Sequence, residues 1–182
     1  SGKAEFPLGT DQQGRDILST IMYGSRISLL VALCAVAMSI VMGVGLGLLA
    51  GYVGGRIDSI IMRIADIQLT FPAILVALLI SGIGRQFVPR EMQDSLALYV
   101  IILSIGLTGW VQYARTVRGS TLVEKSKEYV QAARVIGVSK MAIMVRHVLP
   151  NVLGPVLVIA TLNIANAIIA EATLSFLGVG MP

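Results

Sequence analysis

The sequence predicts an all-α fold, a helical bundle that crosses a membrane several times. Hydrophobic residues make up 55% of the 182 residues and charged residues 13%, against roughly 45–50% and 25% in ordinary soluble domains. The charges also leave four long uncharged stretches, at residues 27–55, 67–84, 95–114 and 148–170. Because about 20 helical residues cover the ~30 Å hydrocarbon core of a bilayer, each stretch can hold one membrane span.

Residues 1–26 are polar and rich in turn-forming residues, and we expect them to form an external segment. Asp16 is suited to cap a short helix that ends near Tyr23 and lies on the membrane surface. Asp11 and Asp16 could be taken for a metal-binding pair, but turn and capping roles suit aspartate better at these positions. No metal is therefore expected here.

The end of the first span, residues 27–50, contains the start of a glycine repeat of period four that continues beyond the span: Gly43, Gly47, Gly51 and Gly55. Such a repeat places small residues on one helix face and lets another helix backbone approach closely. We interpret it as a helix-packing surface rather than a substrate groove. The pair Gly54-Gly55 indicates a turn out of the membrane.

A polar link and a proline mark the region of the second span. The link contains two arginines and two aspartates at spacings that allow pairing along one helix, namely Arg56, Asp58, Arg63 and Asp66. The span itself, residues 67–84, contains Pro72, which should bend the helix or start it there. The bend could be a mechanical hinge or a packing feature, and the sequence leaves both open.

The third span, residues 95–114, carries Trp110 and Tyr113 near its end, where aromatic rings favour the headgroup level. Residues 115–147 then hold seven Lys and Arg and two acidic residues, a net charge of +5, whereas the rest of the chain carries −1. The positive-inside rule therefore places this loop in the cytoplasm, together with residues 51–66. Residues 1–26 and 85–94 are then external.

Glu171 closes the fourth span, residues 151–170. An ionisable group at the end of a membrane helix is costly unless it is paired or wet, which makes Glu171 a candidate for a pathway or pairing role. At the outer interface the same side chain could simply reach water. Both interpretations remain open.

The loop between the third and fourth spans contains two amphipathic helical patterns separated by Gly137. The first pattern has the apolar face Tyr129, Ala132, Ala133 and Ile136. Ser139 can cap the second helix, which has the apolar face Met141, Met144, Val145 and Val148, and Pro150 suits the first turn of the span that follows. Such helices could lie on anionic lipid, but the small pair Ala132-Ala133 favours insertion into a protein cleft.

Several function classes are excluded by what the chain lacks. One cysteine, Cys34, and one histidine, His147, rule out a Cys/His metal site as the centre of function. The spans offer neither a catalytic constellation for an intramembrane enzyme nor the ionisable residues at mid-span that a secondary transporter requires. Gly2-Lys3 is the only Gly-Lys pair and belongs to no phosphate-binding loop, so the chain is not expected to hydrolyse ATP.

Several stretches together resemble a known family. Gln131-Ala132-Ala133, Gly137 and the later His147-Val148-Leu149-Pro150 are similar to the Glu-Ala-Ala loop of permease subunits of bacterial ATP-binding-cassette importers. The sequences PLGTDQQGRDIL, SRISLLVALCAVAMSIVMGVGLGLLAGYVGG, EYVQAARVIG, RHVLPN and AEATLSFLGVG resemble the dipeptide, oligopeptide and nickel permeases within that group. Two positions depart from the pattern: Gln131 replaces the glutamate, and Phe6 replaces a histidine.

The resemblance implies a type I importer transmembrane domain over residues 27–182, of which this chain holds spans two to five of six. It implies location in the bacterial cytoplasmic (inner) membrane and a permease function, with peptides as the expected cargo and nickel or glutathione as alternatives. A non-transporting membrane anchor and a secondary transporter are more remote alternatives. The chain would be no enzyme and would need no cofactor, because a separate subunit hydrolyses ATP.

The resemblance also implies partners and sites. The partners are a second permease subunit, identical or different, two cytoplasmic ATP-binding subunits, an external solute-binding protein and the lipid bilayer, but no nucleic acid. Within the coupling loop, residues 115–150, the positions expected to dock on the ATPase are Glu128, Gln131, Ala132, Ala133, Arg134, Gly137, His147 and Pro150. Gln131 removes a charge that an ion pair with the ATPase would need, although it keeps a hydrogen-bonding group.

Overall fold

The computed structural model describes residues 7–11, 13–86 and 93–177, and the predicted all-α fold is confirmed in these ranges. One isolated β-bridge joins Thr10 and Asp16. The helices are, in chain order, α1 (Ile17–Val53), α2 (Gly55–Thr70), α3 (Ala73–Gln86), α4 (Gln93–Glu124), α5 (Glu128–Val135), α6 (Lys140–Ala142), a π-helix (Ile143–Val148) and α7 (Leu149–Phe176).

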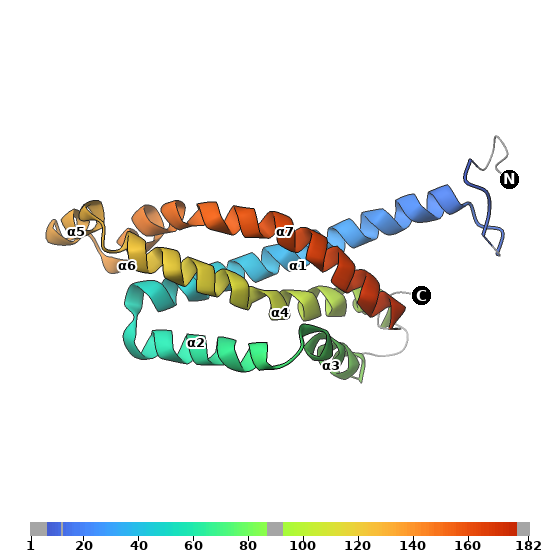
Figure 1. The fold of residues 1–182 in the computed structure, drawn as a ribbon, viewed down its shortest axis with the longest axis horizontal. Coiled ribbons are helices and arrows are strands. Elements are labelled where there is room, and N and C mark those ends of the chain that lie inside the picture. The colour runs from blue at the N-terminus through green and yellow to red at the C-terminus, as the bar shows by residue number, and fades with distance from the viewer. Residues whose placement is uncertain (1–6, 12, 87–92, 178–182) are drawn as a thin grey trace.

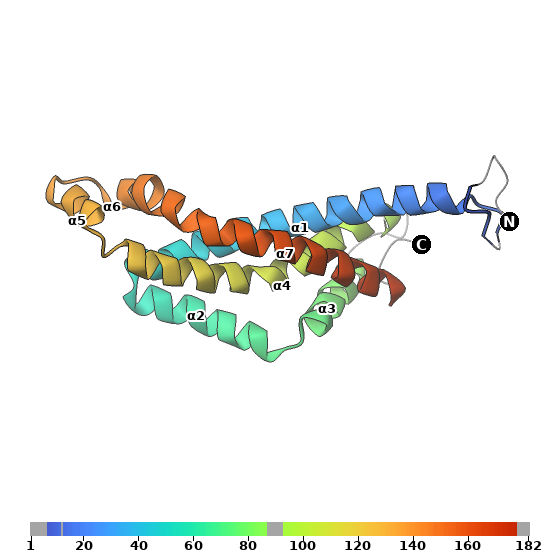
Figure 2. The same cartoon turned by 45° about the horizontal axis from the view of Figure 1, so that its top comes forward.

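Three long helices form the core of an elongated bundle. α1, α4 and α7 run side by side along the long axis of the molecule in both views (Figures 1 and 2) and pack against one another. Their buried contact residues include Ala32, Tyr113, Val117, Val152 and Val156. α5 and α6 lie at one end of the bundle, and the N-terminus lies at the other (Figure 1).

The number of membrane spans depends on how one bent pair of helices is counted. α1, the segment Leu98–Glu124 and the rod Lys140–Phe176 are each long and apolar enough to cross a membrane. α2 and α3 satisfy this condition only as a pair, bent by 93°. The bend lies at Pro72, where Phe71 takes the extended conformation that a residue before proline prefers. The expected second span is thus a broken one.

The first helix differs from the expectation at its start. Asp16 caps α1 as predicted, because its carboxylate accepts hydrogen bonds from the backbone N–H groups of Leu18 and Ser19. The expected short surface helix ending near Tyr23 is wrong, since α1 continues without a break to Val53. No proline interrupts the sequence there, and a single glycine, Gly24, does not stop a long helix.

The expected polar link is also helical, and its charges pair differently from the prediction. Residues 56–66 belong to α2, and their aspartates bind arginines of α4 instead of arginines on the same helix. Asp58 accepts two hydrogen bonds from Arg118, one of them 2.7 Å long between Nη2 and Oδ2, and Asp66 pairs with Arg115. The reason is that α2 lies alongside α4, which brings the arginines closer than the predicted neighbours.

Trp110 and Tyr113, which we expect near the headgroup level, are packed inside the bundle rather than exposed on its surface. Trp110 is 5% exposed and Tyr113 is fully buried. The indole N–H of Trp110 donates to Gln68 Oε1 at 2.8 Å, and the Gln68 amide nitrogen donates to the carbonyl of Leu107 at 2.8 Å. The covering helix α2 therefore satisfies the polar end of the tryptophan, which needs no lipid headgroup.

Three of the four repeated glycines lie at the contact between α1 and α4. A Cβ atom on Gly43 would lie 2.5 Å from the Trp110 carbonyl oxygen, and one on Gly51 would lie 2.7 Å from Thr121 Cβ. A Cβ atom on Gly47 would overlap the backbone of Ala114. The fourth, Gly55, lies outside this contact and forms the turn into α2 with a φ of 59°.

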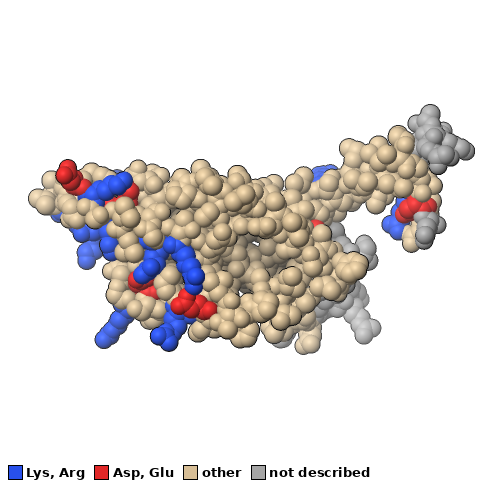
Figure 3. Space-filling view, viewed as in Figure 1, with Lys and Arg blue, Asp and Glu red and all other residues tan. Residues whose placement is uncertain are grey.

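Charged side chains gather toward the ends of the molecule. On the face in Figure 3 most of them lie near the end formed by α5, α6 and the start of α2, while the middle of the bundle is almost free of them. The start of α2 and α5 thus lie at the same end, and the start of α1 lies opposite (Figure 1). The assignment of these ends to the two sides of the membrane stays a prediction.

Candidate functional site

The end of the bundle opposite the N-terminus carries residues 125–148, which we name the tip segment. Residues 115–124 of the predicted loop belong to α4. After α5 the chain turns at Gly137, whose φ of 84° is readily reached by glycine. Ser139 Oγ then accepts a hydrogen bond from the backbone N–H of Ala142 and caps α6, as predicted.

The second amphipathic helix of the loop is not a separate element. α6 has only three residues and passes through the π-helix directly into α7, so that Lys140–Phe176 form one rod of 37 residues. Pro150 lies in the first turn of α7, where the intrahelical donor that proline lacks is not required. A movement of the tip segment can therefore be transmitted along a membrane-spanning helix.

The apolar faces of the tip segment differ from those predicted. α5 packs on the bundle through Val130 and Ala133, whereas Ile136 is 78% exposed. The neighbouring Val135 is 87% exposed and Met141 63% exposed. Both sides of α5 carry apolar residues, so the helical period alone could not decide which side faces the bundle. The tip segment consequently presents exposed apolar side chains at the end of the molecule.

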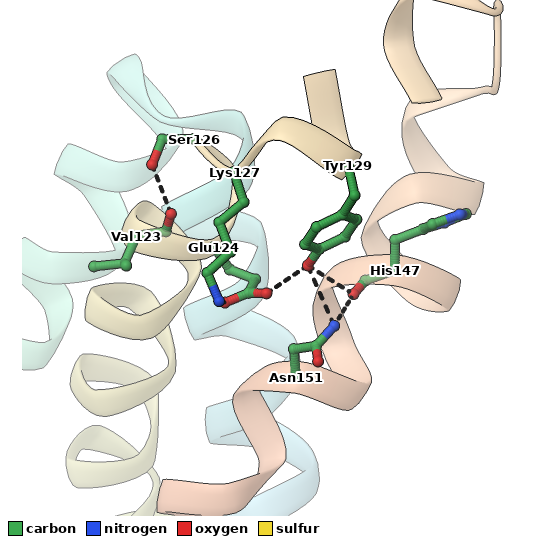
Figure 4. Close-up of polar contacts among 7 residues, drawn as sticks. All are labelled: Val123, Glu124, Ser126, Lys127, Tyr129, His147 and Asn151. Carbon is green, nitrogen blue, oxygen red and sulfur yellow. Dashed lines mark hydrogen bonds and ion pairs between the residues drawn. The ribbon is translucent and has the colours of Figure 1, made fainter. Parts of the chain in front are cut away.

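A polar cluster holds the tip segment in place (Figure 4). The Tyr129 hydroxyl lies 2.5 Å from Glu124 Oε1, and Lys127 Nζ lies 2.8 Å from Glu124 Oε2. Asn151 donates to the carbonyl of His147 at 2.7 Å and to the Tyr129 oxygen at 3.2 Å. These contacts join the end of α4, the start of α5 and the start of α7. The buried carboxylate of Glu124 is at the centre of the cluster.

Tyr129 is a hydrogen-bond donor at every physiological pH. Burial, followed by the hydrogen bond to Glu124 and the charge of that carboxylate, raises the pKa of Tyr129 to about 12. The phenol has one proton, which it can donate to Glu124 or to the His147 carbonyl 3.2 Å away. The ionised carboxylate is the stronger acceptor.

Further contacts attach the tip segment to the end of α1. Lys125 Nζ donates to the carbonyl of Gly51 at 2.8 Å, and the Arg134 guanidinium lies 5.6 Å from the ring centre of Tyr52. Beside them is a groove of about 670 Å³ between α1 and the tip segment. It is lined by Leu49, Tyr52, Val53, Arg134, Val138, Lys140, Met141, Ile143 and Met144. Sequence reasoning missed the α1 side of this groove, because nothing local links residue 52 to residue 134.

The predicted docking residues divide into two groups. Most are exposed on the tip segment or next to it: Glu128, Gln131, Ala132, Arg134, Gly137 and Pro150. Ala133 is buried against the bundle, and His147 is half-buried with its ring stacked on Tyr129 at 6.5 Å between ring centres. Gln131 donates to the backbone carbonyl of Lys125 at 3.4 Å. The structure thus keeps most of the set together at one end of the molecule.

Glu171 lies near the other end of the bundle, at the contact between α1 and α7. Its carboxylate accepts hydrogen bonds from the hydroxyls of Ser28 and Ser175, both at 2.8 Å. Among the described residues no lysine or arginine pairs with it. A cavity of about 210 Å³ adjoins the carboxylate. Glu171 therefore joins two spans through neutral hydroxyl groups.

A third site, which sequence reasoning missed, is a pocket that opens on the surface of the bundle. It has a volume of about 170 Å³ and is lined by apolar residues together with polar side chains from three helices: Ser39, Thr108, Gln112, Tyr113, Asn163 and Asn166. An amide without a hydrogen bond in an apolar environment costs roughly 2–7 kcal/mol, so such residues require partners. The sequence signal for this site is the presence of side-chain amides within the otherwise apolar, uncharged stretches.

These features define the chain as a polytopic helical membrane protein with a structured tip at one end of its bundle. The chain belongs to the family described as binding-protein-dependent transport system inner membrane component, whose sequence profile matches residues 43–182.

Relatives named as transport system permease proteins match almost the whole chain. It is similar to the oligopeptide transport system permease protein OppC of Bacillus subtilis (strain 168), with 38% identity over 96% of this chain and 54% of the relative. The protein of the same name from Haemophilus influenzae is 41% identical over 95% and 52%. The dipeptide transport system permease protein DppC of Bacillus subtilis is 40% identical over 98% and 52%. The chain spans about half the length of these relatives.

Proposed function

We propose that the chain is part of a permease subunit that imports peptides at the expense of ATP hydrolysed by a separate subunit. Family membership supports the transport role, and the names of the relatives support peptides over nickel or glutathione. As a permease subunit the chain is no enzyme. Its partners would be a second permease subunit, two cytoplasmic ATP-binding subunits and an external solute-binding protein.

The tip segment is the proposed docking site for the ATPase. The observation that carries this proposal is the set of exposed apolar side chains Val135, Ile136 and Met141 on a segment that also carries basic residues. Contiguous apolar side chains exposed to water usually mark an interaction surface. A lipid surface would suit the basic charge equally well, but the small, exposed Ala132 on the same segment favours a protein partner.

The same geometry supports a way to couple ATP hydrolysis to transport. Met141 lies at the start of the rod Lys140–Phe176, and the Glu124–Tyr129–Asn151 contacts join this rod to α4. Closure of two ATPase subunits would then move α7 and α4 together rather than bend a loose loop. In this proposal the break at Pro72 is the hinge that lets α2 and α3 follow.

The docking proposal is tested by Ile136→Ser in the complete permease assembled with its partners. Because Ile136 is 78% exposed, the substitution should leave folding unchanged but remove an apolar contact with the ATPase. We expect at least a fivefold loss of ATPase retention in co-purification and of ATP-driven uptake. Leu8→Ser is the matched control, since Leu8 is also apolar and 55% exposed but lies in the N-terminal segment.

If Ile136→Ser retains the ATPase as firmly as the unmodified protein, the tip segment is not the docking site. If the variant instead keeps its ATPase but no longer binds anionic vesicles, the tip segment is a lipid-binding surface.

A further inference from the structure

The cavity lined by Gln112, Asn163 and Asn166 opens on the surface of the bundle near the middle of three spans. At 1.5 Å per residue, Asn163 is about 21 Å along α7 from Leu149, and Gln112 is about 18 Å along α4 from Glu124. Each residue is therefore roughly half-way through its helix. The hydrogen-bonding groups at this depth are uncharged, and they come from helices that are far apart in the sequence.

The side chains around the cavity satisfy each other only in part. Asn163 donates to Gln112 Oε1 at 3.2 Å, and Asn166 is 3.5 Å from Asn163 Oδ1. The Gln112 amide nitrogen has no acceptor among the described residues, and Gln112 and Asn166 are exposed on the surface of the bundle. These amides therefore retain hydrogen-bonding capacity toward something outside the described chain.

Tyr113 adds an independent observation. Its side chain is fully buried and lines the same cavity. Its hydroxyl lies near Asn163 but forms no hydrogen bond of normal geometry with any described residue. A buried hydroxyl without a partner is costly, so a further polar group that enters the cavity would be favoured beside Tyr113.

We propose that Gln112, Asn163 and Asn166 bind the main chain of the peptide as it passes through the membrane. A primary amide offers one acceptor and two donor hydrogens in a plane, which matches the C=O and N–H groups of a peptide bond. No charged residue lines the cavity, so the site does not select for charged peptide side chains. The site therefore suits peptides of varied sequence, and it rests on the proposed peptide-import function.

The cavity also adjoins the broken span. Ala73, the first residue of α3 after the bend at Pro72, is part of its lining. A change in the angle between α2 and α3 would therefore alter the cavity wall. The amides are placed where the proposed hinge motion could open or close their access to the peptide.

Photo-crosslinking tests the contact directly. The variant carries p-benzoylphenylalanine at position 166 of the complete permease. It is assembled with its partner subunits in proteoliposomes, supplied with ATP and the solute-binding protein, and given radiolabelled trialanine. We expect labelled peptide to be attached to the Asn166 variant during turnover. The matched control is the same substitution of Leu157, which is nine residues away, on the opposite side of α7, and 65% exposed.

The double substitution Asn163→Leu with Gln112→Met tests the hydrogen bonds. Both changes preserve approximate size and remove the amides, so we expect at least a tenfold loss of trialanine uptake with assembly and ATPase activity retained. The single variant Gln112→Met, which keeps the amide of Asn163, should take up trialanine faster than the double variant.

The outcomes separate this inference from the proposed function. Unchanged uptake in the double variant, or equal labelling from positions 166 and 157, overturns the inference and leaves the importer role intact. Attachment of position 166 to a partner permease helix, with no labelled peptide, shows that the amides join subunits and also overturns it. If the unmodified complex takes up no trialanine, the proposed peptide function fails, and the inference fails with it.

Discussion

At the scale of single residues, the packing of the helices depends on a few positions where one added carbon atom would overlap a neighbouring helix. Gly47 is such a position because α4 passes over it at backbone contact. Gly45, two residues away on the same helix, has open space where a Cβ atom would be. The two glycines therefore provide a matched comparison of the same substitution.

We predict that Gly47→Ala destabilises the bundle and that Gly45→Ala does not. The added methyl at Gly47 would push α1 away from Ala114, and overpacking of this kind typically costs about 1–3 kcal/mol. The same change at Gly45 gains helix propensity, up to about 1 kcal/mol. Thermal unfolding in detergent should show a lower Tm for Gly47→Ala only. Equal Tm values would mean that the α1–α4 contact adapts easily.

Tyr129 is a second decisive residue, because it joins three helices through one oxygen atom. Tyr129→Phe should weaken the tip segment by about 1–3 kcal/mol, as the buried carboxylate of Glu124 loses a donor and keeps only Lys127. We expect faster hydrogen exchange in α5 of the variant, with α1 unchanged. Identical exchange in both proteins would show that the cluster does not hold the tip.

The same residue gives a pH prediction. The pKa of Tyr129 is raised from 10.0 to about 12 in the folded protein, so its contribution to stability is complete below pH 10 and is lost as the pH rises toward 12. The difference between the tyrosinate absorbance titrations of the protein and Tyr129→Phe should therefore show one phenol ionising near pH 12. Ionisation of this phenol near pH 10 would contradict the hydrogen bond to Glu124.

At the scale of elements, α2 is the helix whose position depends most on polar contacts. It is attached to α4 by the Asp58–Arg118 and Asp66–Arg115 pairs and by Gln68. On its other side it exposes apolar residues, namely Ile57, Ile60, Ile64 and Ile67. Lipid or a partner subunit can cover that side, and the ion pairs determine which side turns inward.

We predict that Asp58→Arg releases α2 and that adding Arg118→Asp restores it. The single change places two positive charges together, whereas the double change re-forms a pair of opposite orientation. Limited proteolysis between α1 and α2 should be several times faster in the single variant and near normal in the double one. Arg63→Gln serves as control, because no described acidic residue pairs with Arg63. Failure of the double variant to recover would show that the charges do not act as a pair.

At the scale of the whole molecule, two ends with different chemistry are joined by rigid rods. The tip segment lies at the end of α4 and α7, and Glu171 lies near the far end of the same α7. The polar cavity lies between them, next to the broken span. The proposed coupling therefore needs no change in the shape of α7, because a rigid shift of this helix would move the tip segment, the cavity wall and Glu171 together.

Most of the large-scale organisation was predictable from the sequence, and most of the contacts were not. The uncharged stretches located the three long spans, and Pro72 located the break. The length of α1 and the continuity of α6 with α7 were missed. Both errors came from assuming that polar or basic residues end a helix, although helices continue where packing supports them.

By itself the sequence determined the features that depend on near neighbours in the chain. These are the apolar composition that requires a membrane, the Asp16 cap, the bend at Pro72 and the turn at Gly137, where local sterics and hydrogen bonding leave few choices. Only the tertiary structure decided which face of α5 is buried, which arginine pairs with Asp58 60 residues away, and that Gln112 and Asn163 meet in one cavity. Those contacts depend on helices packed side by side, and the periodicity of one helix carries no information about which helix will lie beside it.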